Sequence, residues 1–181
     1  ILWFGVDDAN TAVLTPMYTS ITEIPECYRR GNGSMTEFSW TSAFWIHNWV
    51  ANMAYNRYEP MIRDIRPVQK ELEDSYVDLV KNTDAKALEL LKSSPAQATA
   101  YLTEVCGKVA NETTARWKKL GEYLLVKYMD GNVKKEKDGK FEENGYGQIV
   151  SPNFPGYSQE YYDQVAKSAE AKHLEVPKKD K

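Results

Sequence analysis

The sequence contains few of the residues that most often carry catalysis or bind metals. Among its 181 residues are two cysteines and two histidines. Cys27 and Cys106 belong to no C-x-x-C or His-flanked pair, so the sequence holds no zinc or redox motif, and whether they pair stays open. His47 and His173 alone do not make a histidine-based metal site or a Ser-His-Asp triad. We therefore expect no metal and no cofactor.

A basic excess and long apolar runs are also lacking. Lys and Arg total 23 against 26 for Asp and Glu, a formal net charge of -3, so no nucleic-acid partner is expected. No apolar run reaches the ~18 residues of a membrane span. Aromatic residues are instead plentiful, with five Trp, twelve Tyr and five Phe. So many apolar groups indicate a folded chain with a sizeable core.

Strand character is confined to the N-terminal part. Residues 1–6 and 12–19 are mostly apolar, aromatic or β-branched, and an acidic turn, Asp7 to Asn10, separates them. This pattern predicts two short strands. Pro16 cannot donate to a central ladder, which places the second strand at an edge.

The following residues predict helices. Residues 42–58 contain no Gly or Pro and are apolar almost all round, which is typical of a buried helix. His47 on this helix is expected to be a hydrogen-bonded core residue. Apolar spacing over residues 68–80 predicts a second helix, and Asp84 is expected to cap a short third one.

Ser94 and Pro95 form a strong start signal for a long helix that reaches Met129, with bends expected at Gly107 and Gly121. Beyond it we expect a hairpin about Asp138-Gly139, a loop over 144–157 and a short helix capped by Ser158. The fold class is thus α+β and predominantly helical. Three regions are expected: 1–60 with strands and the buried helix, 61–132 helical, and 133–181 with hairpin, loop and C-terminal helix.

Five polar residues are candidates for chemistry. Asp7 and Asp8 could orient an amine, although turn formation alone explains two aspartates there. Asn48 and Asn52 share a helix face and could donate to a substrate carbonyl or join the helix to the strands. Arg57 could bind a carboxylate or lie at a helix end, where the dipole favours a cation.

Several short strings resemble the closing part of the C69 dipeptidases, most closely bacterial members of the Bacteroides type. The resemblance covers most of the chain and is densest over residues 1–75. The strings are Trp3-Phe4-Gly5-Val6-Asp7-Asp8-Ala9, Pro16-Met17-Tyr18, Ile21-Thr22-Glu23-Ile24-Pro25, Phe38-Ser39-Trp40, Ser42-Ala43-Phe44-Trp45, Asn48-Trp49-Val50-Ala51-Asn52, Tyr55-Asn56-Arg57-Tyr58, Val68-Gln69 with Glu71-Leu72-Glu73, and Lys127-Tyr128-Met129-Asp130-Gly131.

The resemblance implies an N-terminal-nucleophile hydrolase with an αββα sandwich, to which the predicted strands would belong. In such enzymes the first cysteine attacks a dipeptide's carbonyl, with its own α-amine as base. Here residue 1 is Ile, so we expect the C-terminal part of such an enzyme, inactive alone. Within the full-length enzyme, Asp7 or Asp8 would bind the dipeptide's amine, Asn48 or Asn52 its carbonyl, and Arg57 its carboxylate. A signal peptide there would place the enzyme in the periplasm.

Two other functions stay open. The first is a non-catalytic helical module for interaction or homo-oligomerisation, with a binding face drawn from Trp117, Tyr123 and Tyr161. The second is part of a penicillin- or bile-salt-type amide hydrolase, which shares the N-terminal-nucleophile scheme.

Overall fold

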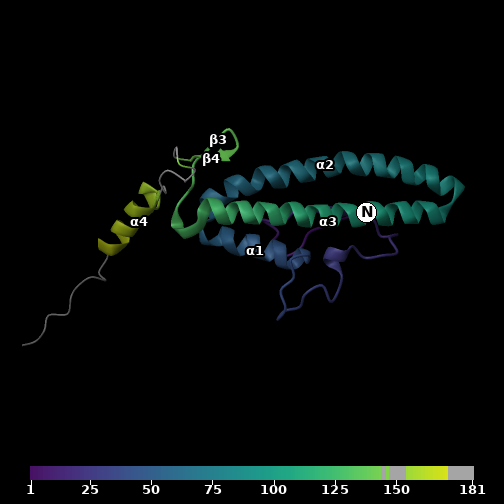
Figure 1. Cartoon of the computed structure of the whole chain (residues 1–181), viewed down its shortest axis with the longest axis horizontal. Helices are drawn as coiled ribbons and strands as arrows, with labels where there is room; N and C mark the ends of the chain where they lie inside the picture. Colours follow the sequence, from purple (N-terminus) through teal and green to yellow (C-terminus); the bar gives the residue numbers. More distant parts are fainter. Residues whose placement is uncertain (144–145, 147–153, 171–181) are drawn as a thin grey trace, which may run out of the picture. The chain divides into compact units, whose positions relative to one another are not determined.

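The structure is a computed structural model in which residues 1–143, 146 and 154–170 are described. Residues 169 and 170 are described by their backbone only. The chain divides into two compact units, Ile1–Tyr128 and Met129–Lys181. The fold is α+β and predominantly helical, as predicted (Figure 1). None of the helices formed by the described residues has the length and apolarity needed to cross a membrane.

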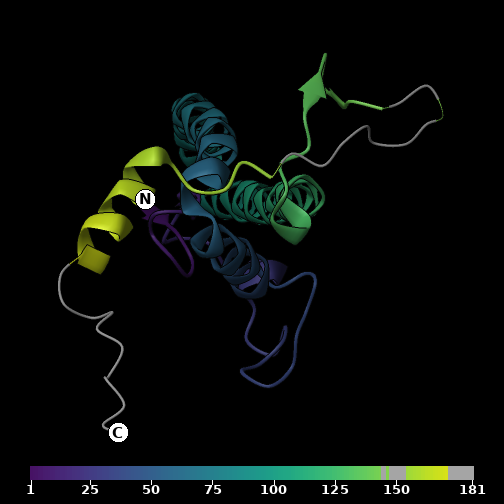
Figure 2. The same cartoon turned by 90° about the vertical axis from the view of Figure 1, so that its left-hand side faces the viewer.

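Three helices build the first unit: α1 (Ala43–Asn56), α2 (Tyr58–Ser93) and α3 (Pro95–Tyr128). Helices α2 and α3 form an antiparallel hairpin, and α3 lies between α2 and α1 (Figures 1 and 2). The start signal for α3 is confirmed, because the Ser94 hydroxyl accepts a hydrogen bond from the Gln97 N–H at 3.4 Å. No break interrupts α3 at its two glycines.

Helix α2 corrects the prediction of separate second and third helices. It is continuous from Tyr58 to Ser93, and Asp84 caps no helix start. The Asp84 carboxylate instead accepts a hydrogen bond from the Tyr18 hydroxyl at 2.6 Å. Because the residues around Asp84 are mostly good helix formers and include no Gly or Pro, nothing local ends the helix there.

The inner face of α1 forms the core against α3. Ile46 and Val50 are fully buried on α1, as are Trp117 and Leu124 on α3. Trp117 was expected on an exposed binding face, and that prediction is wrong. Its indole is the largest completely buried side chain and stacks on the His47 ring, with 5.5 Å between ring centroids.

The strands lie beside these helices. Strand β1 (Leu2–Phe4) pairs antiparallel with β2 (Thr15–Met17), with Trp3 opposite Pro16. Strand β2 packs against α2 and α3, whereas Leu2, Trp3 and Phe4 of β1 are 39% to 56% exposed. The short 3₁₀ helix η1 (Glu26–Tyr28) follows and contacts α1 and α3. Strand β1 therefore presents an apolar, uncovered surface in the described part of the chain.

The second unit contains the 3₁₀ turn η2 (Met129–Gly131), strands β3 (Glu136–Lys137) and β4 (Lys140–Phe141), and helix α4 (Gln159–Glu170). The predicted hairpin about Asp138-Gly139 is confirmed. Ser158 caps α4 as predicted, because its hydroxyl accepts the Tyr161 N–H at 3.2 Å. Most of the loop expected over 144–157, and His173, lie outside the described residues.

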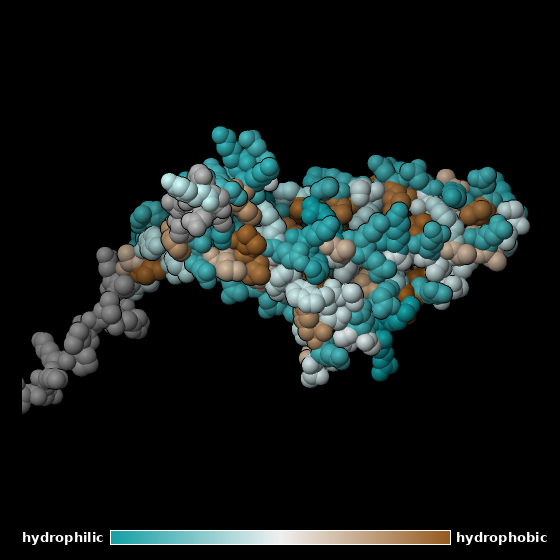
Figure 3. Space-filling view, in the orientation of Figure 1, coloured by the Kyte–Doolittle hydropathy of each residue, from teal (hydrophilic) through white to brown (hydrophobic). Residues whose placement is uncertain are grey.

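Apolar side chains also reach the surface of the α2–α3 hairpin. Val77, Leu88 and Leu91 of α2 are exposed, and apolar patches alternate with hydrophilic residues over this part of the surface (Figure 3). Singly exposed apolar residues are normal on monomers, so homo-oligomerisation stays a prediction.

Gly121 of α3 lies directly against the Trp49 ring of α1. A Cβ built at this position would lie 2.5 Å from Cζ3 of the Trp49 ring. The glycine in α3 is therefore a packing requirement that outweighs its helix cost of about 1 kcal/mol.

We predict that Gly121→Ala lowers the free energy of unfolding by about 1–2 kcal/mol, because overpacking exceeds the gain in helix propensity. Gly107→Ala in the same helix is the matched control, since a Cβ there meets nothing within 4 Å. It should raise stability by up to about 1 kcal/mol. Urea denaturation of both variants measures the difference, and equal effects would contradict this packing.

Candidate functional site

The acidic turn, residues 7–11, connects β1 to the segment before β2 and lies on α1. Its backbone closes through the Ala12 N–H, which donates to the Asp8 carbonyl at 2.9 Å. Asp7 has a positive φ of 65°, a left-handed conformation that Asp adopts more readily than most residues. Asn10 donates to the Tyr58 hydroxyl at 2.7 Å, at the start of α2. The turn is thus fixed to both helices.

Asp8 is held by three hydrogen bonds. The Thr11 N–H and hydroxyl donate to its Oδ2 at 2.9 and 2.8 Å, and the Tyr55 hydroxyl of α1 donates to its Oδ1 at 3.0 Å. Burial by itself raises the pKa of Asp8, but these bonds outweigh it and hold the pKa below its ordinary value. The turn therefore carries a carboxylate that stays ionised at neutral pH.

Asp7 and the asparagines of α1 lie together. Asn48 Nδ2 donates to Asp7 Oδ1 at 3.0 Å, and Asn52 Nδ2 donates to the Asn48 carbonyl at 2.8 Å and to Asn48 Oδ1 at 3.2 Å. Asn48 thus joins the helix to the acidic turn. The exposed Asp7 carboxylate and the Asn52 amide oxygen are acceptors, and acceptors suit a cationic group. The carbonyl role of Asn48 and Asn52 stays a prediction.

Arg57 lies one residue beyond the last turn of α1. Its Nη1 donates to the Tyr128 carbonyl at 3.4 Å, and its guanidinium carbon lies 5.8 Å from the centre of the Tyr128 ring. Nine residues separate it from Asn48, about 13 Å along a helix axis. A cation at the last carbonyls of α3 is also favoured by the helix dipole. Its proposed role in binding a carboxylate stays a prediction.

Two residues of this cluster were not predicted from the sequence. Thr11 and Tyr55 supply the hydroxyls that hold Asp8. Tyr55 follows Asn48 by seven residues and Asn52 by three, so helix periodicity puts all three on one face. This spacing could have indicated that Tyr55 belongs to the cluster, but it does not show which residue the Tyr55 hydroxyl binds.

His47 lies on the opposite, buried face of α1 and is the hydrogen-bonded core histidine that the sequence predicted. Its Nδ1 donates to the Ala43 carbonyl at 2.9 Å, since a carbonyl can only accept. Its Nε2 has no hydrogen-bond partner among the described residues. Burial lowers the pKa of His47 from its ordinary value of 6.5 to about 4.

We predict that His47 makes the protein less stable in mild acid. Its pKa is lower in the folded than in the unfolded chain, so the unfolded chain binds more protons between pH 6.5 and about 4. The free energy of unfolding should therefore fall by about 3 kcal/mol as the pH drops through that window.

Urea denaturation at a series of pH values tests this prediction. His47→Gln should flatten the curve between pH 6.5 and 4.5, whereas His173→Gln, at the only other histidine of the sequence, should keep it. An unchanged slope in the His47 variant would contradict the prediction.

Both cysteines are buried and free. Burial raises the pKa of the Cys27 and Cys106 thiols above the ordinary value. For Cys27, burial is the largest cause, Glu26 raises the pKa further, and a hydrogen bond with Thr114 lowers it without reversing the direction. Neither thiol is activated as a nucleophile.

Comparison with known proteins gives one family match. Residues 1–71 match the model of Peptidase family C69, a stretch that holds the acidic turn, α1 and the start of α2. No curated protein and no solved structure matches the chain. The resemblance seen in the sequence is confirmed over these 71 residues. The similar string at residues 127–131 lies outside them.

Proposed function

Because residues 1–71 form a C69-family peptidase region, we propose that this chain is the C-terminal part of a cysteine dipeptidase. In this proposal the nucleophile is an N-terminal cysteine encoded upstream of residue 1. Its thiolate attacks the dipeptide carbonyl, the leaving amine takes a proton, and water hydrolyses the thioester that remains.

Besides the family match, two features of the structure support a nucleophile encoded upstream. The apolar side chains of β1 are left uncovered although β2 beside it is packed against the helices. Apolar strands normally bury one face against another layer, and an αββα sandwich would supply that layer. The raised pKa of both thiols argues in addition that neither Cys27 nor Cys106 replaces the nucleophile.

The acidic turn is the observation that carries the proposal. A dipeptide has a free α-ammonium, and a turn that carries two carboxylates is a suitable partner for it. Asp8 is engaged by Thr11 and Tyr55, whereas exposed Asp7 has one oxygen bonded to Asn48. In our proposal Asp7 therefore contacts the ammonium directly and Asp8 contributes negative charge behind it.

The same feature favours a dipeptidase over a penicillin- or bile-salt-type amide hydrolase. Those enzymes act on acylated amides, in which no ammonium flanks the scissile bond. A doubly acidic turn would contribute nothing to such a substrate. Comparing free dipeptides with N-acetyl dipeptides separates the two functions.

We predict that the polypeptide extended upstream hydrolyses dipeptides and that Asp7→Asn lowers kcat/KM by about 10- to 100-fold, because a charged hydrogen bond to the ammonium is lost. Asn fits the left-handed backbone and keeps the bond from Asn48, so unfolding should be unchanged. Asp74→Asn is the matched control, at an exposed aspartate that pairs with Lys70 in the i,i+4 position.

Three outcomes would count against the proposal. They are hydrolysis of N-acetyl dipeptides as fast as free ones, equal effects of the Asp7 and Asp74 variants, and thiol-dependent turnover by the 181-residue chain that Cys27→Ala abolishes.

A further inference from the structure

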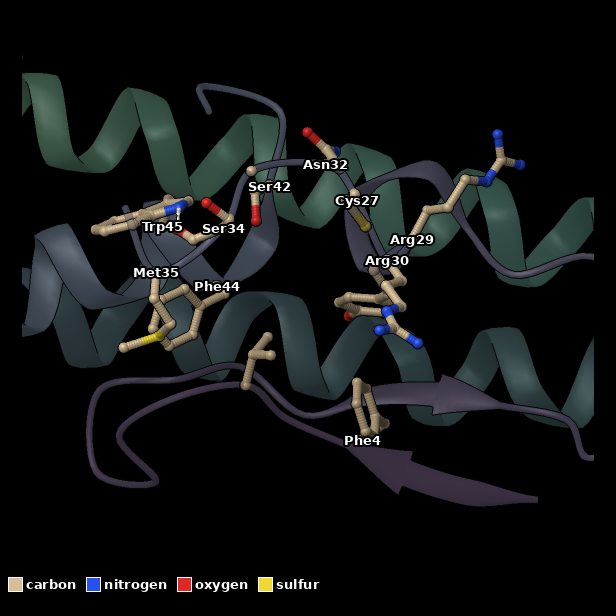
Figure 4. Close-up of a pocket in the computed structure, with 14 residues that line it drawn as sticks. Phe4, Cys27, Arg29, Arg30, Asn32, Ser34, Met35, Ser42, Phe44 and Trp45 are labelled. Atoms are coloured by element: carbon tan, nitrogen blue, oxygen red, sulfur yellow. Dashed lines mark hydrogen bonds between the residues drawn. The ribbon is translucent and has the colours of Figure 1, made fainter. Parts of the chain in front are cut away.

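A pocket of about 330 Å³ lies at the start of α1, beside the acidic turn. We call it the loop pocket. Figure 4 shows its walls, which come from the end of β1, η1, the loop that follows η1 and the first turn of α1. Much of the lining is aromatic, and the rings that bound it are Phe4, Tyr28, Phe44 and Trp45.

The loop pocket is electropositive. Arg29 and Arg30 line it, and no Asp or Glu is among its lining residues. Arg29 pairs with Glu26 at 2.8 Å and points out of the pocket, whereas the Arg30 side chain extends toward Phe4 (Figure 4). Arg30 forms no ion pair or hydrogen bond with any residue that the structure describes. Its guanidinium is thus available to an anion.

The N-terminus of α1 adds a second anion-binding element. Ser42 occupies the cap position, but its side chain makes no cap hydrogen bond. The first-turn N–H groups of α1 therefore have no acceptor on the Ser42 side chain. Ser42 is only 6% exposed, and its hydroxyl is directed into the pocket (Figure 4). The hydroxyl of Ser42 forms no hydrogen bond with any residue that the structure describes. A buried, unpartnered hydroxyl at an uncapped helix start suits a carboxylate.

The loop pocket and the acidic turn carry opposite charges and are contiguous. Val6 lines the pocket and directly precedes Asp7. On α1, Phe44 lines the pocket one turn before Asn48, which binds Asp7. A zwitterionic dipeptide carries the two complementary charges, an ammonium and a carboxylate.

We propose that the loop pocket binds the C-terminal carboxylate of the dipeptide, with Arg30 as the pairing cation and Ser42 and the α1 N-terminus as neutral donors. This inference rests on the proposed function. The aromatic walls then hold the side chain of the second residue, which favours apolar and aromatic side chains there. A required free carboxylate next to that side chain selects dipeptides over longer peptides.

Binding to the 181-residue chain tests the proposal without any turnover. The chain is titrated with L-alanyl-L-phenylalanine, with its C-terminal amide and with its N-acetyl derivative, and ¹⁵N NMR follows the Arg30 side chain. The free dipeptide should bind about tenfold or more tightly than the amide, because the amide cannot pair with a guanidinium. The N-acetyl derivative keeps the free carboxylate, so it should still shift the Arg30 side-chain signal, whereas the amide should not.

Three variants give the test its specificity. Arg30→Gln should remove the difference between acid and amide, and Ser42→Ala should reduce it. Arg63→Gln, at an exposed arginine on α2 that pairs with Glu59, should leave it intact. Thermal unfolding of each variant checks that the fold is kept.

Equal binding of acid and amide, a difference that survives Arg30→Gln, or no detectable binding would overturn the proposal. These results are independent of the dipeptidase assay. The upstream-extended polypeptide with Arg30→Gln separates the two proposals. If it cleaves dipeptides with an unaltered preference for acid over amide, the dipeptidase function stands, and the loop pocket is not its carboxylate site.

Discussion

Close packing of α1 against α3 positions the acidic turn and one wall of the loop pocket. Trp49 of α1 lies on the bare backbone of Gly121, and His47 stacks on the buried Trp117. Since protein interiors are packed as densely as crystals, these contacts leave α1 little freedom to rotate or slide. Its exposed face then holds the acidic turn at a fixed place, and its first turn forms a wall of the loop pocket.

One helix thus presents two oppositely charged sites. The acidic turn is bound to the middle of α1 through Asn48 and Tyr55, whereas the loop pocket combines Arg30 with the positive end of the α1 dipole. A ligand with both charges gains from both sites, while one with a single charge gains from only one. In our proposal the dipeptide occupies both sites at once.

The elements predicted well from the sequence are those with local signals. The largely apolar segment without Gly or Pro at 42–58, the Ser94-Pro95 start and the Asp138-Gly139 turn each depend on neighbouring residues, and each is found in the structure. The clustering of Asp7 with Asn48 was also foreseeable in part, because the family resemblance and the helix spacing drew attention to both.

The features that the sequence did not predict depend on distant partners. Asp84 is a good cap by type, but Tyr18, 66 residues away in sequence, binds its carboxylate within a continuous helix. Trp117 was predicted on an exposed binding face, yet its side chain is completely buried. The loop pocket forms only because the loop after η1 folds over the start of α1. Periodicity cannot indicate such contacts.

The most direct test of this account is a crystal structure of the protein bound to a dipeptide analogue whose peptide bond is replaced by a non-cleavable methyleneamine. The account predicts the terminal ammonium within hydrogen-bond distance of the Asp7 carboxylate and the carboxylate against Arg30 and Ser42, with the second side chain among the aromatic rings. An analogue bound away from the acidic turn, or with its two ends reversed, would contradict it.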